Sequence, residues 1–330
     1  MDESPGVVVL YNESQRLIKG EPEDMLAEQE VVACAQAIAA ALTESGYRVV
    51  RAPIRVGVEE ALAPYPAAEW RVFNLAEGME GRLFEEARIA WVLEAMGYRF
   101  SGSDGAALAC STNKALAKAR LAAAGVPTPA WRVFRTPQEV DCDGLTFPLI
   151  VKPVAEDASL GIGPEAVVRD PAALARRVGY IAERYRQAAL AEGFIAGREF
   201  NVSLWGEEPE LLPLAEIDWS AFADPHERIV SFAAKWQPDS FEYQHTPVLC
   251  PAPVTPELAV RIAQVARESW RAIGCRGYAR VDMRVDDEGV PYVIEVNCNP
   301  DIAPDGGFFR AVSRAGYTFR DMAVRILELA

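Results

Sequence analysis

The chain has 330 residues, enough for two or three domains with a substantial core. Half of the residues are hydrophobic and a quarter are charged, the balance of a soluble globular protein. The formal net charge of −15 argues against binding to a nucleic acid backbone, which needs basic patches, although a few clustered Lys and Arg side chains could still bind a polyphosphate.

The cysteines and histidines further limit the metal and catalytic sites that the chain could form. The six cysteines are dispersed and form no Cys-x-x-Cys pair, so zinc sites and thioredoxin-like chemistry are not expected, and a reducing cytoplasm is the expected location. His226 and His245 are the only histidines, too few for a His-based cluster or triad. The acidic start of the chain does not resemble a signal peptide, and no membrane partner is expected because the longest apolar stretch, residues 31–42, is too short to span a bilayer.

Roughly the first 100 residues alternate between strands and helices, as in a doubly wound α/β unit with a parallel sheet. Gly46 and Gly97 follow the two predicted helices, where glycine commonly ends a helix. The predicted strands are residues 7–11, 47–52 and 70–75, and the predicted helices are residues 28–44 and 84–96.

The middle of the chain is a second mixed region. A helix that reaches Ala124 is broken by a Gly- and Pro-rich segment, and strands are predicted at residues 131–134 and 149–151. A polar loop with glycines, residues 155–163, comes next, and Pro171 opens the following helix at a favourable position. A further strand is predicted at residues 200–205.

Two segments near the C-terminus, residues 277–285 and 290–297, are the most informative part of the sequence. A polar turn ending in Gly289 separates them, so an antiparallel hairpin is predicted. The register that pairs Asp282 with Glu295 also pairs Arg280 with Asn297, and strand alternation puts these side chains on one face. The other face would pack in the core through its apolar residues, Val281, Met283, Ile294 and Val296.

Two carboxylates and an amide oxygen on a rigid sheet form a hard, oxygen-only cluster. Mg²⁺ favours such a site, completed by substrate phosphates and water, and an arginine beside it can neutralise a reacting oxyanion. The alternative is a charged, solvated hairpin face. Cys298, which follows Asn297, is expected to point to the apolar face and pack there rather than react.

Five motifs in order resemble the ATP-grasp superfamily and, within it, the D-alanine–D-alanine ligases. They are NKALAK (residues 113–118), LIVKP (149–153), EGFIAGREF (192–200), ARVD (279–282) and IEVNCNP (294–300). The resemblance covers almost the whole chain and implies an α/β (α+β) protein with three domains. These would be an N-terminal α/β domain (residues 1–110), a central ATP-grasp lid (111–190) and a C-terminal ATP-grasp domain that carries the hairpin (191–330).

The resemblance also implies that ATP is clamped between the central and C-terminal domains. Lys114 and Lys152 would bind its phosphates, Lys235 would reach the transferred phosphoryl group, and the loop 157–161 would close over them with backbone N–H groups and the Ser159 hydroxyl. The adenine and ribose would be held by four residues, Glu192, Phe194, Ile195 and Glu199.

The remaining implied roles concern metal and substrate. Two Mg²⁺ ions, with Mn²⁺ as an alternative, would be held by Asp282, Glu295 and Asn297, and Arg280 would stabilise the tetrahedral intermediate. Glu28 matches the glutamate that holds the amino group of the first substrate, with a solvated helix acid as the alternative. It follows an acidic loop, residues 13–25, that is longer than the family pattern.

The activity implied is ATP-dependent ligation of a small-molecule carboxylate to an amine or amino acid, through an acylphosphate. A homodimer is compatible with this assignment. Two alternatives stay open: another ATP-grasp reaction, such as carboxylation or phosphorylation of a different acceptor, and a non-catalytic ATP-binding regulator. A P-loop is excluded because the chain has no Gly-x-x-x-x-Gly-Lys-Ser/Thr motif.

The sequence departs from the ligase pattern where the second substrate would bind. Ala158 and Trp236 stand where the ligases have a Ser in the phosphate loop and a Tyr beside the phosphate-contacting Lys. After the hairpin, Asp301 and Asp305 occupy the segment expected to hold a Gly and a Ser-bearing helix start. These departures predict an acceptor other than D-alanine, larger or carrying a cationic or amide group. The alternative for the two aspartates is that Asp305 only caps the helix beginning at Gly306 and Asp301 faces a metal or solvent.

Overall fold

The computed structural model describes residues 5–13, 21, 25–78 and 82–330, and the side chains of residues 25–29 lie outside this description. Most of the acidic loop predicted at residues 13–25 therefore lies outside the described residues. Along the described ranges, every helix is too short or too polar to cross a bilayer.

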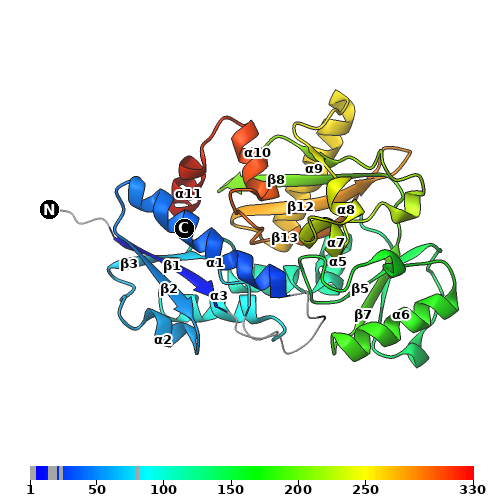
Figure 1. Ribbon diagram of the computed structural model, residues 1–330, viewed down its shortest axis with the longest axis horizontal. Helices are drawn as coiled ribbons and strands as arrows, with labels where there is room; N and C mark the ends of the chain where they lie inside the picture. Colours follow the sequence, from blue (N-terminus) through cyan, green and yellow to red (C-terminus); the bar gives the residue numbers. More distant parts are fainter. Residues whose placement is uncertain (1–4, 14–20, 22–24, 79–81) are drawn as a thin grey trace.

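The N-terminal sheet is parallel, with strand order β2-β1-β3. Its central strand is buried at every position, which explains its continuous apolar sequence. Helix α1 covers the face that carries Val7 and Val9, and helices α2 and α3 cover the face that carries Val8 and Leu10 (Figure 1). The predicted doubly wound unit is thus confirmed. The elements are β1 (Gly6–Asn12), α1 (Met25–Glu44), β2 (Val49–Ile54), α2 (Val58–Leu62), β3 (Trp70–Asn74) and α3 (Glu85–Ala95).

Two helices lead from this unit to the next sheet, α4 (Gly105–Ser111) and α5 (Lys114–Ala123). Each starts at a side-chain cap: Asp104 accepts a hydrogen bond from the Ala107 amide, and Asn113 accepts one from the Leu116 amide. The second cap fixes where α5 begins and so places Lys114 in its first turn.

The central sheet is antiparallel, with order β4-β7-β5-β6, and α6 covers one of its faces. Its elements are β4 (Trp131–Phe134), β5 (Leu149–Pro153), β6 (Val167–Val168), α6 (Pro171–Arg184) and β7 (Ala189–Gly193). Asp170 caps α6 and Pro171 occupies its first turn, as the sequence predicts. The boundary predicted at residue 190 falls inside β7, and the three-domain division stays a prediction.

The C-terminal sheet has the order β11-β10-β8-β12-β13, with β9 paired to β8. Helix α9 packs on one face of this sheet. Helices α10 and α11 pack on the other face, in the same hydrophobic core as α1 (Figure 1). The strands are β8 (Arg198–Gly206), β9 (Glu210–Leu211), β10 (Ala215–Ile217), β11 (Val248–Leu249), β12 (Gly277–Val285) and β13 (Pro291–Asn297). The helices are α7 (Phe232–Trp236), α8 (Phe241–Gln244), α9 (Pro256–Ile273), α10 (Gly307–Arg314) and α11 (Phe319–Glu328).

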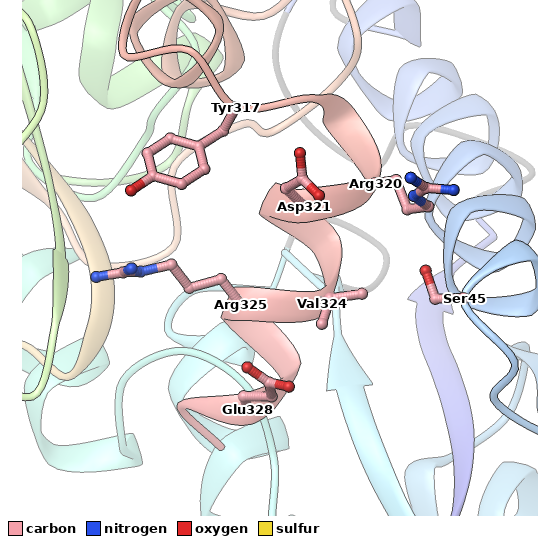
Figure 2. Close-up of a pocket in the computed structure, with 7 residues that line it drawn as sticks. All are labelled: Ser45, Tyr317, Arg320, Asp321, Val324, Arg325 and Glu328. Carbon is pink, nitrogen blue, oxygen red and sulfur yellow. The ribbon is translucent and has the colours of Figure 1, made fainter.

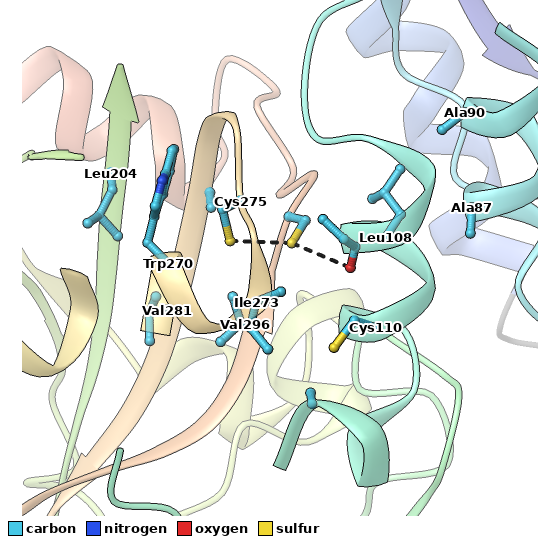
Figure 3. Close-up of a cluster of buried hydrophobic side chains, with 14 of the residues drawn as sticks. Ala87, Ala90, Leu108, Cys110, Leu204, Trp270, Ile273, Cys275, Val281 and Val296 are labelled. Atoms are coloured by element: carbon cyan, nitrogen blue, oxygen red, sulfur yellow. Dashed lines mark hydrogen bonds between the residues drawn. The ribbon is translucent and has the colours of Figure 1, made fainter. Parts of the chain in front are cut away.

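One core joins the N-terminal helices to the C-terminal sheet (Figure 3). In that view Leu108 and Cys110 of α4 lie between Ala87 and Ala90 of α3 on one side and Val296 and Cys275 of the C-terminal sheet region on the other. Cys298 is 1% exposed in this core, and its Sγ lies 3.5 Å from Sγ of Cys275. The expectation that Cys298 packs rather than reacts therefore agrees with its position.

The predicted hairpin register is confirmed in the part that matters for the site. Asp282 pairs with Glu295, and Arg280 pairs with Asn297. The register then shifts, so that Met283 pairs with Val293. This irregularity brings Val293 into the core in place of Ile294, and the prediction that Ile294 packs there was wrong because the extra residue breaks the alternation.

Candidate active site

The polar face of the hairpin is organised around Asp282. Arg280 forms a bidentate pair with it, from Nε to Oδ1 at 2.7 Å and from Nη2 to Oδ2 at 2.8 Å. Asn201 of β8 donates to Oδ1 at 2.8 Å, and Asn297 donates to Oδ2 at 3.0 Å. Such charge-assisted, bidentate bonds fix the orientation of both side chains. Burial alone would lower the pKa of Arg280, but Asp282 reverses this effect, so the guanidinium stays charged.

Lys114 joins the hairpin to the loop after β5. Its Nζ donates to Glu295 Oε1 at 3.0 Å, to Asp157 Oδ1 at 3.1 Å and to the Glu156 carbonyl at 2.5 Å. The Lys114 side chain is 5% exposed. Burial would lower its pKa, but Glu295 and Asp157 hold it above the ordinary value. A buried ammonium that already binds oxygen anions is suited to bind phosphate oxygens in their place.

The predicted metal ligands supply oxygen atoms, and their chemistry fits Mg²⁺. Burial would raise the pKa of Glu295, but Lys114 and the other donors hold it well below its ordinary range, so this carboxylate is ionised. Among the described residues, no group of three His, Cys, Asp or Glu side chains is placed to hold a metal. A cation here would therefore need the Asn297 amide oxygen and phosphate oxygens in addition to Asp282 and Glu295.

Glu192 lies between two lysines and is fully buried. Lys152 of β5 donates to its Oε1 at 2.7 Å, and the ammonium of Lys118 contacts its Oε2. Burial would raise the pKa of Glu192, but the two ammonium groups reverse this and leave it below the ordinary value. Lys152, predicted to bind phosphate, is thus held beside the segment predicted to line the adenine.

The segment that follows β7 forms the rest of the predicted nucleotide wall. Arg284 binds Glu199 Oε2 through Nε at 2.9 Å and Nη2 at 2.7 Å, and donates to the Ile195 carbonyl at 2.7 Å. Its guanidinium lies 4.8 Å from the centroid of the Phe194 ring. Gly197 is required here because a Cβ would come within 1.7 Å of the Val285 carbonyl oxygen. Arg284 therefore orients all three residues predicted to line this wall beyond Glu192.

The loop predicted to cover the phosphates is fastened to the segment around α7. Ser159 Oγ donates to the Val230 carbonyl at 2.8 Å, and Trp236 Nε1 donates to the Ala158 carbonyl at 3.0 Å. Ala158 and Ser159 both have left-handed backbone, with φ of 54° and 61°. In this conformation the Ser159 hydroxyl donates to Val230, so donation to a phosphate would require it to leave that bond.

Lys235 lies on α7, next to Trp236, and its side chain reaches solvent. Surrounding protein atoms and the charge of Arg280 lower its pKa. Close to it, burial and the charges of Asp301 and Asp305 raise the pKa of Glu30 on α1 to about 7. Acidic groups thus gather on the side of the site where the sequence departs from the ligase pattern.

Glu28, the predicted partner of the substrate amino group, lies on α1, but its side chain falls outside the described residues. Its role stays a prediction. Glu30, two residues further along α1, is the described carboxylate of this helix whose pKa is raised by burial and by the charges of Asp301 and Asp305.

Three residues in contact with the predicted site were not identified from the sequence. Arg284 shares the strand alternation of Arg280 and Asp282, so the pattern alone could have indicated it. Asn201 pairs with Asp282 across β8 and β12, a contact that depends on strand order. Lys118 ends the NKALAK motif, but nothing in the sequence tells it apart from an exposed helix lysine.

A separate surface pocket lies between the end of α1 and α11 (Figure 2). It has a volume of about 320 Å³ and is lined by Ser45, Tyr317, Arg320, Asp321, Val324, Arg325 and Glu328. None of these belongs to the predicted site. The pocket mixes acidic and basic side chains, and Arg325 is already paired with Glu210 at 2.6 Å.

Comparisons with known proteins agree with this geometry. The family described as D-ala D-ala ligase C-terminus matches residues 121–328. The uncharacterized protein y4sG of Sinorhizobium fredii is 32% identical over 303 residues, which cover 90% of this chain and 87% of that protein. A D-alanine–D-alanine ligase of Acidiphilium cryptum is 31% identical over 309 residues, covering 92% and 94%.

Solved structures support the same fold. The D-alanine–D-alanine ligase from Bacillus anthracis, in its crystal structure complexed with ATP, matches 99% of this chain and 97% of its own with a TM-score of 0.77 and 22% identity. The predicted mixed α/β class, with its parallel N-terminal sheet, is thus confirmed. The chain therefore belongs to the D-alanine–D-alanine ligase family and carries its C-terminal ATP-grasp domain.

Proposed function

We propose that this protein is an ATP-dependent carboxylate–amine ligase whose acceptor is not D-alanine. The observation that carries the proposal is the bridge made by Lys114 between Glu295 of the hairpin and Asp157 of the covering loop. A charged lysine joins two acidic side chains there, and the bidentate pair of Arg280 and Asp282 lies on the same face of the hairpin. This is the charge pattern that phosphoryl transfer from ATP requires.

ATP would occupy the space between the central and C-terminal sheets. Phosphate binding would draw Lys114 and Lys152 away from their carboxylate partners, and Lys235 would approach the γ-phosphate from α7. The adenine would lie near Phe194 and Ile195, against a small apolar group, Ile150, Ala166 and Ile229. Glu199, held by Arg284, would accept hydrogen bonds from the ribose hydroxyls.

Asp282, Glu295 and Asn297 would hold Mg²⁺, which offsets charge on the phosphate oxygens when it is bound. The carboxylate of the first substrate attacks the γ-phosphorus in line, forming an acylphosphate and releasing ADP. The amine of the second substrate then attacks the acyl carbon, and phosphate leaves. Arg280, partly buried on β12 and charged, is suited to stabilise the oxyanion of that step.

The contact between Ala158 and Trp236 supports a different acceptor. These are the two positions where the sequence departs from the ligase Ser and Tyr, and here the indole of Trp236 bonds directly to the Ala158 carbonyl. At these two positions an indole and a backbone carbonyl therefore make the contact, while Ser159 fastens the same loop to Val230. Asp301 and Asp305 disfavour an acceptor carboxylate nearby, since like charges repel.

An amine and amino-acid panel with Mg-ATP tests the proposal, scored by phosphate release and product mass. We expect product formation with an acceptor other than D-alanine. Robust D-alanyl-D-alanine synthesis, at a rate equal to the best pair in the panel, would overturn the acceptor assignment. Release of phosphate with no amide product in any combination would overturn the ligase assignment.

The expected cellular location follows from the thiols. All six cysteines are free in the structure. Free, mostly buried thiols are typical of proteins in a reducing compartment, which supports a cytoplasmic enzyme.

A further inference from the structure

Lys118 is a buried lysine that the proposed reaction does not use. It lies on α5, its side chain is 2% exposed, and its ammonium contacts Oε2 of Glu192. Nζ also donates to Thr128 Oγ1 at 2.8 Å, and the Thr128 hydroxyl in turn donates to the carbonyl of Val293 at 2.8 Å. Lys118 therefore connects the predicted nucleotide wall to β13, at the strand position where the hairpin register shifts.

The charge balance of this group is unusual. Two ammonium groups, Lys118 and Lys152, share one directly bound carboxylate, and the nearby carboxylate of Glu295 is already bound by Lys114, so the direct contacts leave positive charge in excess. A buried ionised side chain that loses its partner is strongly disfavoured, because water cannot replace the lost interaction. If Lys118 were absent, Lys152 would be the sole partner of Glu192 and could leave it only by exposing a bare buried carboxylate.

We propose that Lys118 is a positioning residue that keeps Glu192 ionised and fixed, so that Lys152 is free to bind ATP phosphate. This rests on the proposed ATP site. In the unliganded protein both lysines bind Glu192. When ATP binds, the Lys152 ammonium turns to phosphate oxygens while the charge of Lys118 remains beside Glu192 as its counter-charge. The phosphates of the nucleotide then balance the excess positive charge of the group.

A double-mutant cycle between Lys118 and Glu192 tests this directly. The variants are Lys118→Met, Glu192→Gln and the double variant, with the dissociation constant of ATP and Mg²⁺ measured by calorimetry and the melting temperature recorded alongside. We expect Lys118→Met to weaken ATP binding about 30-fold in the wild-type background. In the Glu192→Gln background, where Lys152 has no carboxylate to leave, the same substitution should cost less than about threefold.

A purely structural role for Lys118 predicts the opposite pattern, an equal loss of affinity in both backgrounds, and that result would overturn the proposal. If Lys118→Met alone does not fold, the comparison of the double variant with Glu192→Gln still decides, since neither contains the bare buried carboxylate. A double variant that binds ATP about 30-fold more weakly than Glu192→Gln contradicts the inference.

Thr128→Val is the matched control, because it removes the hydrogen bond from Lys118 to Thr128 and keeps the charge. We expect its ATP affinity to stay within about threefold of the wild type. A loss as large as that of Lys118→Met would assign the effect to the link with the hairpin instead, and would overturn the role in charge balance.

The result is separable from the ligase assignment. Calorimetry needs no acceptor, so a protein that binds ATP and shows the expected cycle but ligates nothing would support this inference and overturn the proposed reaction. A wild-type protein that binds no ATP would overturn both.

Discussion

The hairpin face and the covering loop meet at Lys114, yet they are built in different ways. Asp282 is fixed by ladder pairs on two sides, with Glu295 and Asn201, and by a bidentate arginine. The loop around Ser159 has left-handed backbone and is held by single hydrogen bonds to the segment around α7. The difference indicates that the acidic side chains of the site are held on a rigid sheet, whereas the loop that covers them can open.

Removing a predicted metal ligand from the hairpin should have the largest effect on turnover. Glu295→Ala is expected to reduce ATP-dependent phosphate release about 10³-fold, because the charge that Glu295 positions acts mainly during phosphoryl transfer. The fold should persist, since Lys114 keeps its bonds to Asp157 and the Glu156 carbonyl. Steady-state phosphate release and the melting temperature check both parts.

The control lies in the same hairpin. Glu288 is an exposed carboxylate in the turn between β12 and β13, and Glu288→Ala should leave turnover within about twofold. If Glu295→Ala kept near wild-type phosphate release, the hairpin would not be the metal site, and the solvated-face alternative would stand.

Binding of nucleotide should stabilise the hairpin and the covering loop together. At a concentration of Mg-ATP about 100 times the dissociation constant, mass action on the folded state contributes roughly 2.7 kcal/mol, or several degrees in melting temperature. Thermal unfolding with Mg-ATP, with ATP plus a chelator, and without nucleotide separates the metal contribution from that of ATP. A melting curve unmoved by millimolar Mg-ATP would argue against an ATP site altogether.

The hairpin could be predicted because its strand pairing depends on residues that are close together in the sequence. A two-residue alternation and one polar turn sufficed to pair Asp282 with Glu295. The same rule failed at Ile294, because a register shift depends on how the strand meets its neighbours rather than on its own residues. Helix α9 was absent from the predicted elements although the Thr255 cap and Pro256 mark its start.

The contacts that complete the site could not be obtained from the sequence. Lys118 and Glu192, or Ala158 and Trp236, come from distant segments, and only the packing of α5 and α7 on the sheets brings them together. The resemblance to the ligases supplied roles for single residues. It gave no indication that Trp236 would hold the loop through its indole.

Loosening the covering loop should have a smaller effect than changing the hairpin. Trp236→Phe removes the hydrogen bond to the Ala158 carbonyl, while Ser159 still binds Val230 and the Phe232 amide still donates to the Ile162 carbonyl at 2.9 Å. One such bond contributes about 1 kcal/mol net. Amide exchange across residues 155–163 should therefore quicken about fivefold in the absence of nucleotide, as measured by mass spectrometry.

Trp91→Phe is the matched control, because Trp91 is a largely exposed tryptophan on α3. Its substitution should not change exchange in the loop. Equal exchange in the loop of Trp236→Phe and of the wild type would show that the indole bond does not restrain the loop.

The smallest expected effect is a pH-dependent gain in stability when the carboxyl group of Glu30, on the acidic side of the site, is replaced by an amide. Burial, Asp301 and Asp305 raise the pKa of Glu30 from 4.5 to about 7, with Lys235 opposing them. Between these two pH values the folded protein holds a proton that the unfolded chain releases, so this carboxyl's contribution to stability falls as pH rises through the window and stays lost above pH 7. Glu30→Gln should therefore stabilise the protein by about 1 kcal/mol at alkaline pH, allowing for partial solvent screening, and by nothing measurable in acid.

Urea unfolding across the pH range measures this gain. Glu44→Gln, at the exposed end of the same helix, is the control. A gain independent of pH, or one that Glu44→Gln shares, would show that the carboxylates of Glu30, Asp301 and Asp305 do not repel one another in the folded protein.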